Sequence, residues 1–234
     1  MTDLWSNLPH LWLSIGLPGF EKRSTYQGYP LDFMPEIPID LDEDLSWLLK
    51  NGQAHPGQGL DQWDMYAMPK PAALAIELAA RQNIVLPASF RQFMTSPNLQ
   101  SHVRSCTDCY LDPGERMVET IGSLAGYLIH FLSDSQSCAH WYLHVLRSGE
   151  SSVLETDDLY CYEITNSDWI ENPACRQERI NIEELDFRFC SASFPEFLFR
   201  FWIENEIWYA LHGMRRPLTE LEQAYLGTNS APAS

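Results

Sequence analysis

The sequence predicts an α+β domain, with a single, mainly antiparallel sheet of about five or six strands and helices packed against it. Two observations lead to this class. Helical patterns fill residues 71–96 and the run that begins at Ser193. Between them lie short runs of aromatic and β-branched residues, separated by turn sequences. Helices placed before and after consecutive strands indicate a segregated arrangement rather than alternating βαβ units.

The chain of 234 residues, with 45% hydrophobic and 12% aromatic residues, is long enough to bury a substantial core. Prolines punctuate residues 1–69, which we expect to form an extension that packs on the main domain. Residues 70–226 are expected to form that domain, and residues 227–234 a disordered tail. The extension lacks periodic segments that would supply a core of its own.

Three helices are predicted ahead of the strands. Residues 39–52, IDLDEDLSWLLKNG, place acids at the positive end of a helix and Asn51 and Gly52 at its stop. Residues 71–83 and 86–96, PAALAIELAARQN and LPASFRQFMTS, follow as a pair. Each has a proline near its start, where the missing N–H costs little.

The strands are predicted where the hydrophobic period changes toward two, as an antiparallel meander. The runs are TDCYL (107–111), GYLIHFL (126–132), HWYLHVL (140–146), SSVLET (151–156) and DLYCYEIT (158–165).

Residues 193–213, SFPEFLFRFWIENEIWYALHG, predict one well-delimited and mostly covered helix. Ser193 and Glu196 have the spacing of a capping box, in which each side chain bonds the backbone N–H of the other residue. Apolar residues recur at three- and four-residue spacing around most of the circumference. His212 and Gly213 predict a left-handed cap at the end.

Several of these segments, taken in order, resemble the SUKH superfamily, which includes a fungal cell-wall-assembly regulator and many bacterial immunity proteins. They are LPASFRQFM (86–94), TDCYLD (107–112), LIHFLSDSQSCAHWYLHVL (128–146), FPEFLFRFWIENEIWYALH (194–212) and LTELEQAYL (218–226). The resemblance covers roughly residues 70–226 and implies an α+β domain with a single sheet that works mainly by protein binding. It brings no catalytic residues and leaves the role of residues 1–69 open.

The formal net charge of -17 argues against a nucleic-acid ligand and favours a basic protein partner. An immunity protein that covers a nuclease-type toxin fits this charge, because a phosphate-binding surface is generally basic. A regulatory scaffold that binds an endogenous protein is the alternative, and the sequence indicates no oligomeric state. The candidate contacts are Asp42, Glu43, Asp44, Asp157, Asp158, Trp63 and Trp169.

A transition-metal site of zinc type is a further hypothesis. Alternation along residues 138–146 places Cys138, His140 and His144 on one face, and strand pairing would bring His130 to the same side. A metal-dependent or thiol-dependent enzyme would use these residues. The simpler interpretation is the polar face of a half-buried sheet, with no metal and no cofactor.

Other catalytic patterns are weak, so a non-enzymatic protein is the favoured interpretation. Cys106 and Cys109 form a single Cys-x-x-Cys without the second pair that a structural zinc site requires. No glycine-flanked serine elbow and no phosphate-binding glycine loop is present. The start of the chain lacks a basic n-region, and no apolar run is long enough for a membrane span, so we expect a cytoplasmic protein without membrane contact.

Overall fold

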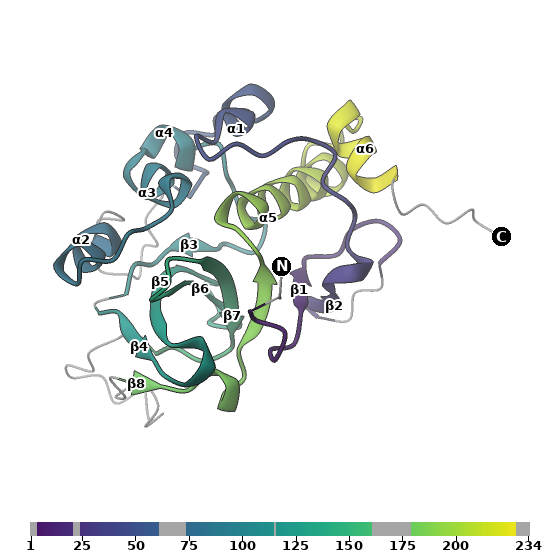
Figure 1. The fold of residues 1–234 in the computed structure, drawn as a ribbon. Helices are drawn as coiled ribbons and strands as arrows, with labels where there is room; N and C mark the ends of the chain where they lie inside the picture. The colour runs from purple at the N-terminus through teal and green to yellow at the C-terminus, as the bar shows by residue number, and fades with distance from the viewer. Residues whose placement is uncertain (1–3, 21–23, 61–73, 115, 161–178, 228–234) are drawn as a thin grey trace.

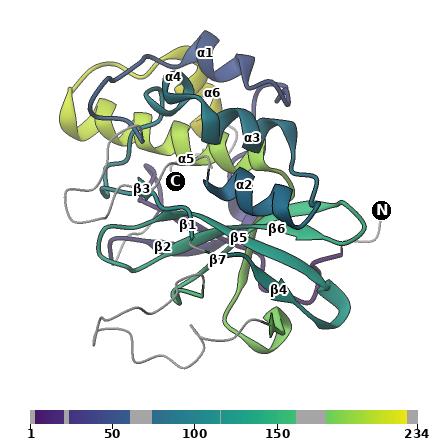
Figure 2. The ribbon, with the colours of Figure 1, turned by 90° about the vertical axis from the view of Figure 1, so that its left-hand side faces the viewer.

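The computed structural model describes residues 4–20, 24–60, 74–114, 116–160 and 179–227. These residues form the predicted α+β fold, in which the helices gather on one side of a curved sheet (Figures 1 and 2). None of the described helices combines the length and the apolar character that crossing a bilayer requires.

The main sheet has seven described strands, more than the five or six predicted, in the order β8-β4-β5-β6-β7-β9, with β3 paired to β5. The predicted meander is confirmed for β5, β6 and β7, which pair antiparallel. Strands β4, β8 and β9 were not predicted, and β4 pairs with β8 in parallel. The bounds are β3 Tyr110–Leu111, β4 Val118–Thr120, β5 Gly126–Ser133, β6 His140–Leu146, β7 Ser151–Thr156, β8 Arg179–Ile180 and β9 Arg188–Ser191.

Two strand predictions need correction. The expected single sheet is joined by a small second one, in which β1 (Leu11–Ser14) pairs antiparallel with β2 (Gln27–Pro30). Residues 158–160 of the predicted strand 158–165 lie in a bend and irregular backbone, and the remainder of that segment lies outside the described residues.

The β5–β6 hairpin is closed by the side chain of Asp134. One of its carboxylate oxygens accepts the backbone N–H of Gln136 at 2.9 Å, and Ser137 adopts a left-handed conformation with φ of 55°. Such an Asx turn reverses the chain without glycine. The register that follows places Ile129 opposite Leu143, with an irregularity between His130 and Leu132.

The helices cover one face of the sheet. Their bounds are α1 Ser46–Asn51, α2 Leu74–Arg81, α3 Ala88–Thr95, α4 Pro97–Gln100, α5 Phe194–Trp208 and α6 Glu220–Gly227, with short 3-10 turns at Leu31–Phe33, Gly122–Leu124 and Ile182–Glu184. The helix predicted over residues 39–52 is wrong in its first half, because Leu45 has a φ of 57° and α1 begins only after it. The missed signal is a period of two: Ile37, Ile39 and Leu41 alternate with polar or proline positions, which is typical of extended backbone.

Helix α5 lies across the helical side of the sheet as predicted. Ser193 caps it, since its hydroxyl accepts the N–H of Glu196, but the Glu196 carboxylate accepts the N–H of Ala192 rather than that of Ser193. The predicted cap at Gly213 is wrong, because α5 continues into a π-helical turn, Tyr209–Gly213, and the left-handed residue is Arg215 with a φ of 51°.

Two apolar cores lie on the two faces of the sheet. The larger core fills the space between the sheet and the helices, where Phe131 packs edge-on against Phe197 with ring centroids 5.5 Å apart. The smaller core lies on the opposite face around Tyr142 and Phe187, and Trp5 from the N-terminal segment packs into it. Residues from the first sixty positions therefore contribute to both cores.

Candidate functional site

Residues 31–45 begin with the 3-10 turn Leu31–Phe33 and continue as a largely irregular, extended segment that runs from β2 across α5 to α1; we call them the acidic strap (Figure 1). Its inner side is apolar: Met34 and Leu45 are buried, and Ile37, Ile39 and Leu41 pack against the larger core. The strap is also held through its backbone, because a guanidinium N–H of Arg200 on α5 donates to the carbonyl oxygen of Pro35 at 2.8 Å.

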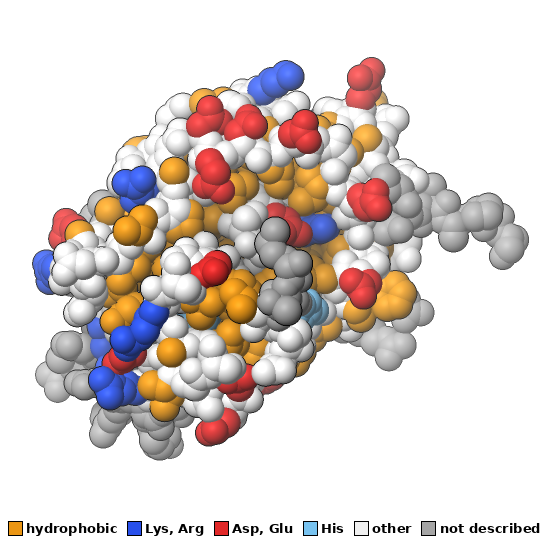
Figure 3. All heavy atoms as spheres, viewed as in Figure 1, with side chains coloured by type: hydrophobic (Ala, Val, Ile, Leu, Met, Phe, Trp, Pro, Cys, Tyr) orange, Lys and Arg blue, Asp and Glu red, His pale blue; other side chains and the backbone are white. Residues whose placement is uncertain are grey.

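The outer side of the strap is a row of carboxylates. Its exposed acidic residues are Asp32, Glu36, Asp40, Asp42, Glu43 and Asp44. Residues 24–49 contain no Lys or Arg, so nothing within this stretch neutralises the row. In Figure 3, Asp and Glu side chains accordingly gather over the upper part of the molecule, where the strap and α1 lie.

The three predicted contacts in the strap make local hydrogen bonds. The hydroxyl of Ser46 donates to Asp42 at 2.6 Å, and its backbone N–H donates to Asp44 at 2.9 Å, at the start of α1. Glu43 accepts the hydroxyl of Ser89 at 2.7 Å in the first turn of α3, where carboxylates are stabilised by unpaired N–H groups. These acids therefore serve the helix starts as well as the surface.

Three further acids of the strap, which were not among the predicted contacts, make fewer interactions than Asp42, Glu43 and Asp44. Within the described part of the chain, no hydrogen bond or ion pair engages the side chains of Asp32, Glu36 and Asp40. The alternation of residues 37–42 is the signal that could have placed Asp40 on an exposed edge. The helix predicted over residues 39–52 includes Asp40 instead.

The second predicted acidic pair lies at the end of β7, away from the strap in sequence. Asp157 forms an ion pair with Arg188 of β9, which also binds the fully buried Glu155 at 2.7 Å. Asp158 is half-buried and accepts the Tyr160 hydroxyl at 3.2 Å. Asp157 therefore ties the end of β7 to β9, whereas Asp158 binds within the segment that follows β7. The two predicted aromatic contacts, Trp63 and Trp169, lie outside the described residues.

The predicted histidine face of the sheet contains a buried hydrogen-bond cluster. Ser133 donates its hydroxyl to Asp112 at 3.0 Å, and the same oxygen lies 2.8 Å from His140 Nδ1 and 3.1 Å from His130 Nε2. All four residues are buried. Burial also lowers the pKa of His140, against the opposing effects of Asp112 and Asp134.

This cluster has the members of a Ser-His-Asp triad but the opposite proton arrangement. A hydroxyl has one proton and two lone pairs, and Ser133 uses its single proton in the hydrogen bond that it donates to the carboxylate of Asp112. The imidazoles of His130 and His140 can then only donate to the serine oxygen, whereas a catalytic serine gives its proton to a histidine. The cluster satisfies polar groups at the end of β5 rather than activating a nucleophile.

The histidine face does not converge on one point. His144 accepts the indole N–H of Trp5 at 3.0 Å and contacts the Thr120 hydroxyl at 3.0 Å, in a separate place from His130 and His140. Burial lowers the pKa of His144 to about 4. Cys138 is exposed in the hairpin turn. Among the described residues no group of three or more His, Cys, Asp or Glu side chains is arranged to hold a metal ion, so the predicted zinc geometry is not formed.

In the Cys-x-x-Cys pair, the thiol of Cys109 is buried and unreactive. Its sulfur is buried beside the hydroxyls of Tyr26 and Thr107, and burial raises the pKa of Cys109 to about 11. A thiol of this kind remains protonated near neutral pH and is a poor nucleophile or metal ligand. Cys106 lies at a half-buried position, where its backbone N–H donates to the Asn205 side chain at 2.7 Å.

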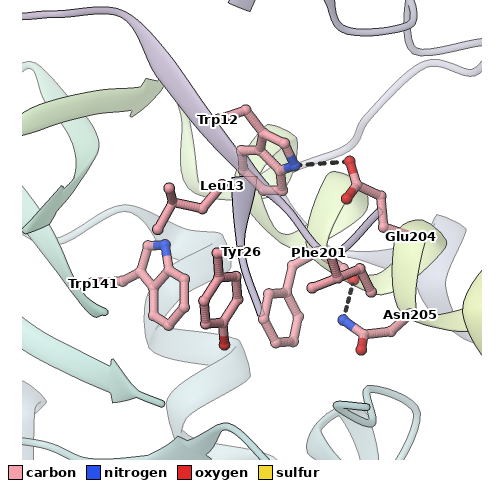
Figure 4. Close-up of a pocket in the computed structure, with 8 residues that line it drawn as sticks. Trp12, Leu13, Tyr26, Trp141, Phe201, Glu204 and Asn205 are labelled. Atoms are coloured by element: carbon pink, nitrogen blue, oxygen red, sulfur yellow. Dashed lines mark hydrogen bonds between the residues drawn. The ribbon is translucent and has the colours of Figure 1, made fainter. Parts of the chain in front are cut away.

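A narrow pocket separates β1 and β2 from α5 and β6, with Trp12, Tyr26, Trp141 and Phe201 among its walls (Figure 4). Glu204 borders it and accepts the indole N–H of Trp12 at 2.7 Å. Burial raises the pKa of Glu204 to about 7. The pocket has room for about one water molecule, so it is a packing gap rather than a ligand site.

Comparison of the chain with protein-family models, with curated proteins and with solved structures finds no match in any of the three. The resemblance to the SUKH superfamily therefore stays a prediction.

Proposed function

We propose that the protein acts without catalysis, by binding a basic surface of a partner protein through the acidic strap. The supporting observation is the row of exposed carboxylates on a segment whose apolar side is already packed against the core. Because Asp32, Glu36 and Asp40 are held by no partner within the described residues, they can meet an incoming cationic surface. Such a row steers a basic partner and suppresses acidic ones.

A nuclease toxin is the partner class that this surface suits best. Its active surface must attract a phosphate backbone and is therefore basic, so a row of carboxylates can occupy it in place of the phosphates. The resemblance to immunity proteins supports the same proposal. A scaffold that binds an endogenous basic protein would use the same strap, and the identity of the captured protein separates the two.

The test is an affinity capture with the full chain, from an extract of the cells that make it, at low and at moderate salt. The strap variant is Asp32→Asn, Glu36→Gln and Asp40→Asn combined. The control variant is Glu150→Gln, Asp186→Asn and Glu220→Gln combined, which removes three exposed carboxylates outside the strap. Mass spectrometry then identifies what each bait retains.

We expect wild type and control to retain a basic protein that moderate salt releases, and the strap variant to retain much less of it. For a nuclease partner, adding the wild-type chain should inhibit DNA or RNA cleavage, and the strap variant should inhibit it weakly. Equal retention by the strap and control variants would reject the strap as the contact surface. A partner that is acidic, or a capture that is insensitive to salt, would reject the electrostatic basis.

A further inference from the structure

A second surface of the molecule has the opposite charge. A cleft of about 430 Å³ lies between α2 and the strands β4 and β5. Its walls are formed by Leu78, Arg81, Gln82, Arg116, Met117, Glu119 and Tyr127. This size falls within the range of pockets that hold small molecules. None of these residues was a candidate in the sequence, because they come from three separate segments.

Four guanidinium groups surround the cleft, from a chain that has only 15 Lys and Arg residues. Arg81 and Arg116 line it, and Arg147 and Arg179 flank it through their ion pairs with Glu119. Two acids belong to the same region: Glu119, held between two arginines, and Glu77, 3.8 Å from Arg81 on α2. Arg116 also donates to the carbonyl oxygen of Tyr160 at 3.5 Å. Figure 3 shows blue side chains at the left and lower left, over α2, β4 and β8.

The cleft offers both hydrogen-bond donors and apolar walls. The side chain of Arg81 is 70% exposed, and the ion pair with Glu77 is long, so its fork of N–H donors can turn toward a ligand. Leu78, Met117 and Tyr127 are half-buried, and Arg147 lies 5.8 Å above the ring of Tyr127. They provide a surface on which the organic part of a ligand can pack.

We propose that this cleft binds a small organic phosphate, with Arg81 facing the phosphate and Tyr127 and Met117 facing the organic part. The guanidinium of arginine can donate two parallel hydrogen bonds to two oxygens of one phosphate. A single carboxylate oxygen would engage fewer of these N–H donors. A long polyanion is the poorer occupant, because the net charge of -17 repels every part of it that extends beyond the cleft. This inference is independent of the partner that the acidic strap binds.

The test is isothermal titration of the full chain in a phosphate-free buffer at low salt. The probes are adenosine 5′-monophosphate, inorganic phosphate and adenosine. The variant is Arg81→Gln, and the control is Arg91→Gln, which removes one exposed arginine from the neighbouring helix α3. Because both positions are exposed, both variants should fold, and circular dichroism with thermal melting verifies this.

We expect the monophosphate to bind wild type and Arg91→Gln alike, and to bind Arg81→Gln at least roughly tenfold more weakly, since one charged hydrogen-bond pair is lost. Inorganic phosphate should compete with it, and adenosine should bind more weakly than the monophosphate. The proposal is overturned if neither phosphate probe binds at millimolar concentration. It is equally overturned if adenosine binds as well as the monophosphate, or if Arg81→Gln and Arg91→Gln bind alike.

Discussion

The charged residues of α5 and those of the acidic strap lie next to each other but differ in their surroundings. Helix α5 buries Arg200, Glu204 and Glu206, and each has a partner from a distant segment. The outer acids of the strap, such as Glu36 and Asp40, remain in water. A charge that is buried must be compensated by the fold, whereas an exposed one can be compensated by another molecule. In a chain this acidic, burial and hydrogen bonding, rather than charge, separate structural carboxylates from candidates for recognition.

The largest effect on stability is expected from the buried pair of Arg104 and Glu206. Arg104 donates to both oxygens of Glu206 at 2.8 and 2.9 Å and lies over the ring of Tyr209. Arg104→Met should lower the free energy of unfolding in urea by about 3–5 kcal/mol, because Glu206 loses its closest partner. The double variant Arg104→Met and Glu206→Leu should recover much of that loss. If Arg104→Met lowers the free energy of unfolding by less than about 1 kcal/mol, the buried charge of Glu206 does not depend on Arg104 for compensation.

The second expected effect is a dependence on pH that comes from Glu204. Its pKa is raised to about 7 in the folded chain from an ordinary value of 4.5, mainly by burial. The folded state therefore holds the proton more tightly, and the stability that this group contributes is present below pH 4.5 and lost as pH rises to about 7. Relative to Glu204→Gln, the wild type should lose on the order of 3 kcal/mol across that range. Urea unfolding at several pH values measures it, and parallel profiles of the two proteins would refute the assignment.

A smaller effect is expected where the two regions meet, at the hydrogen bond from Arg200 to the carbonyl oxygen of Pro35. Arg200→Met should cost about 2 kcal/mol of unfolding free energy, since a charge-assisted bond to a buried carbonyl is lost. It should also increase hydrogen exchange in the strap. Arg91→Met, an exposed arginine on α3, is the matched control. Unchanged exchange in the strap would show that its inner side is held by apolar packing alone.

The smallest effect on stability is expected from the outer acids. The combined Asp32→Asn, Glu36→Gln and Asp40→Asn variant should unfold within about 0.5 kcal/mol of wild type, because no hydrogen bond or ion pair among the described residues engages these side chains. Its capture of the partner should nevertheless fall well below that of the control variant. A large loss of stability would mean that the strap acids are structural, like those of α5.

The features that could be predicted from the sequence are those that hydrophobic periodicity, turn residues and helix caps determine. The period of two in residues 126–132 and 140–146, with turn residues between them, was enough to place the β5–β6 hairpin. The capping residue Ser193 located the start of α5. The common side of His130, His140 and His144 also followed from alternation.

The remaining features depend on contacts between distant residues. Strand β8 has two residues and pairs with β4, about sixty positions away, so no local pattern reveals it. The helix predicted over residues 39–52 starts too early, because a run of acids before Ser46 is typical of a helix start, while the positive φ of Leu45 delays that start. The arginine cleft could not be predicted, since only the folded sheet brings Arg81 beside Arg116.

The most direct test of the strap as the recognition surface is the salt dependence of the affinity of the captured partner. Titration of the purified partner into wild type, the strap variant and the control variant at several salt concentrations gives the slope of log Kd against log salt. We predict that the strap variant binds more weakly at low salt and has a distinctly smaller slope, whereas the control retains the wild-type slope. Equal slopes in all three proteins would show that another surface makes the contact.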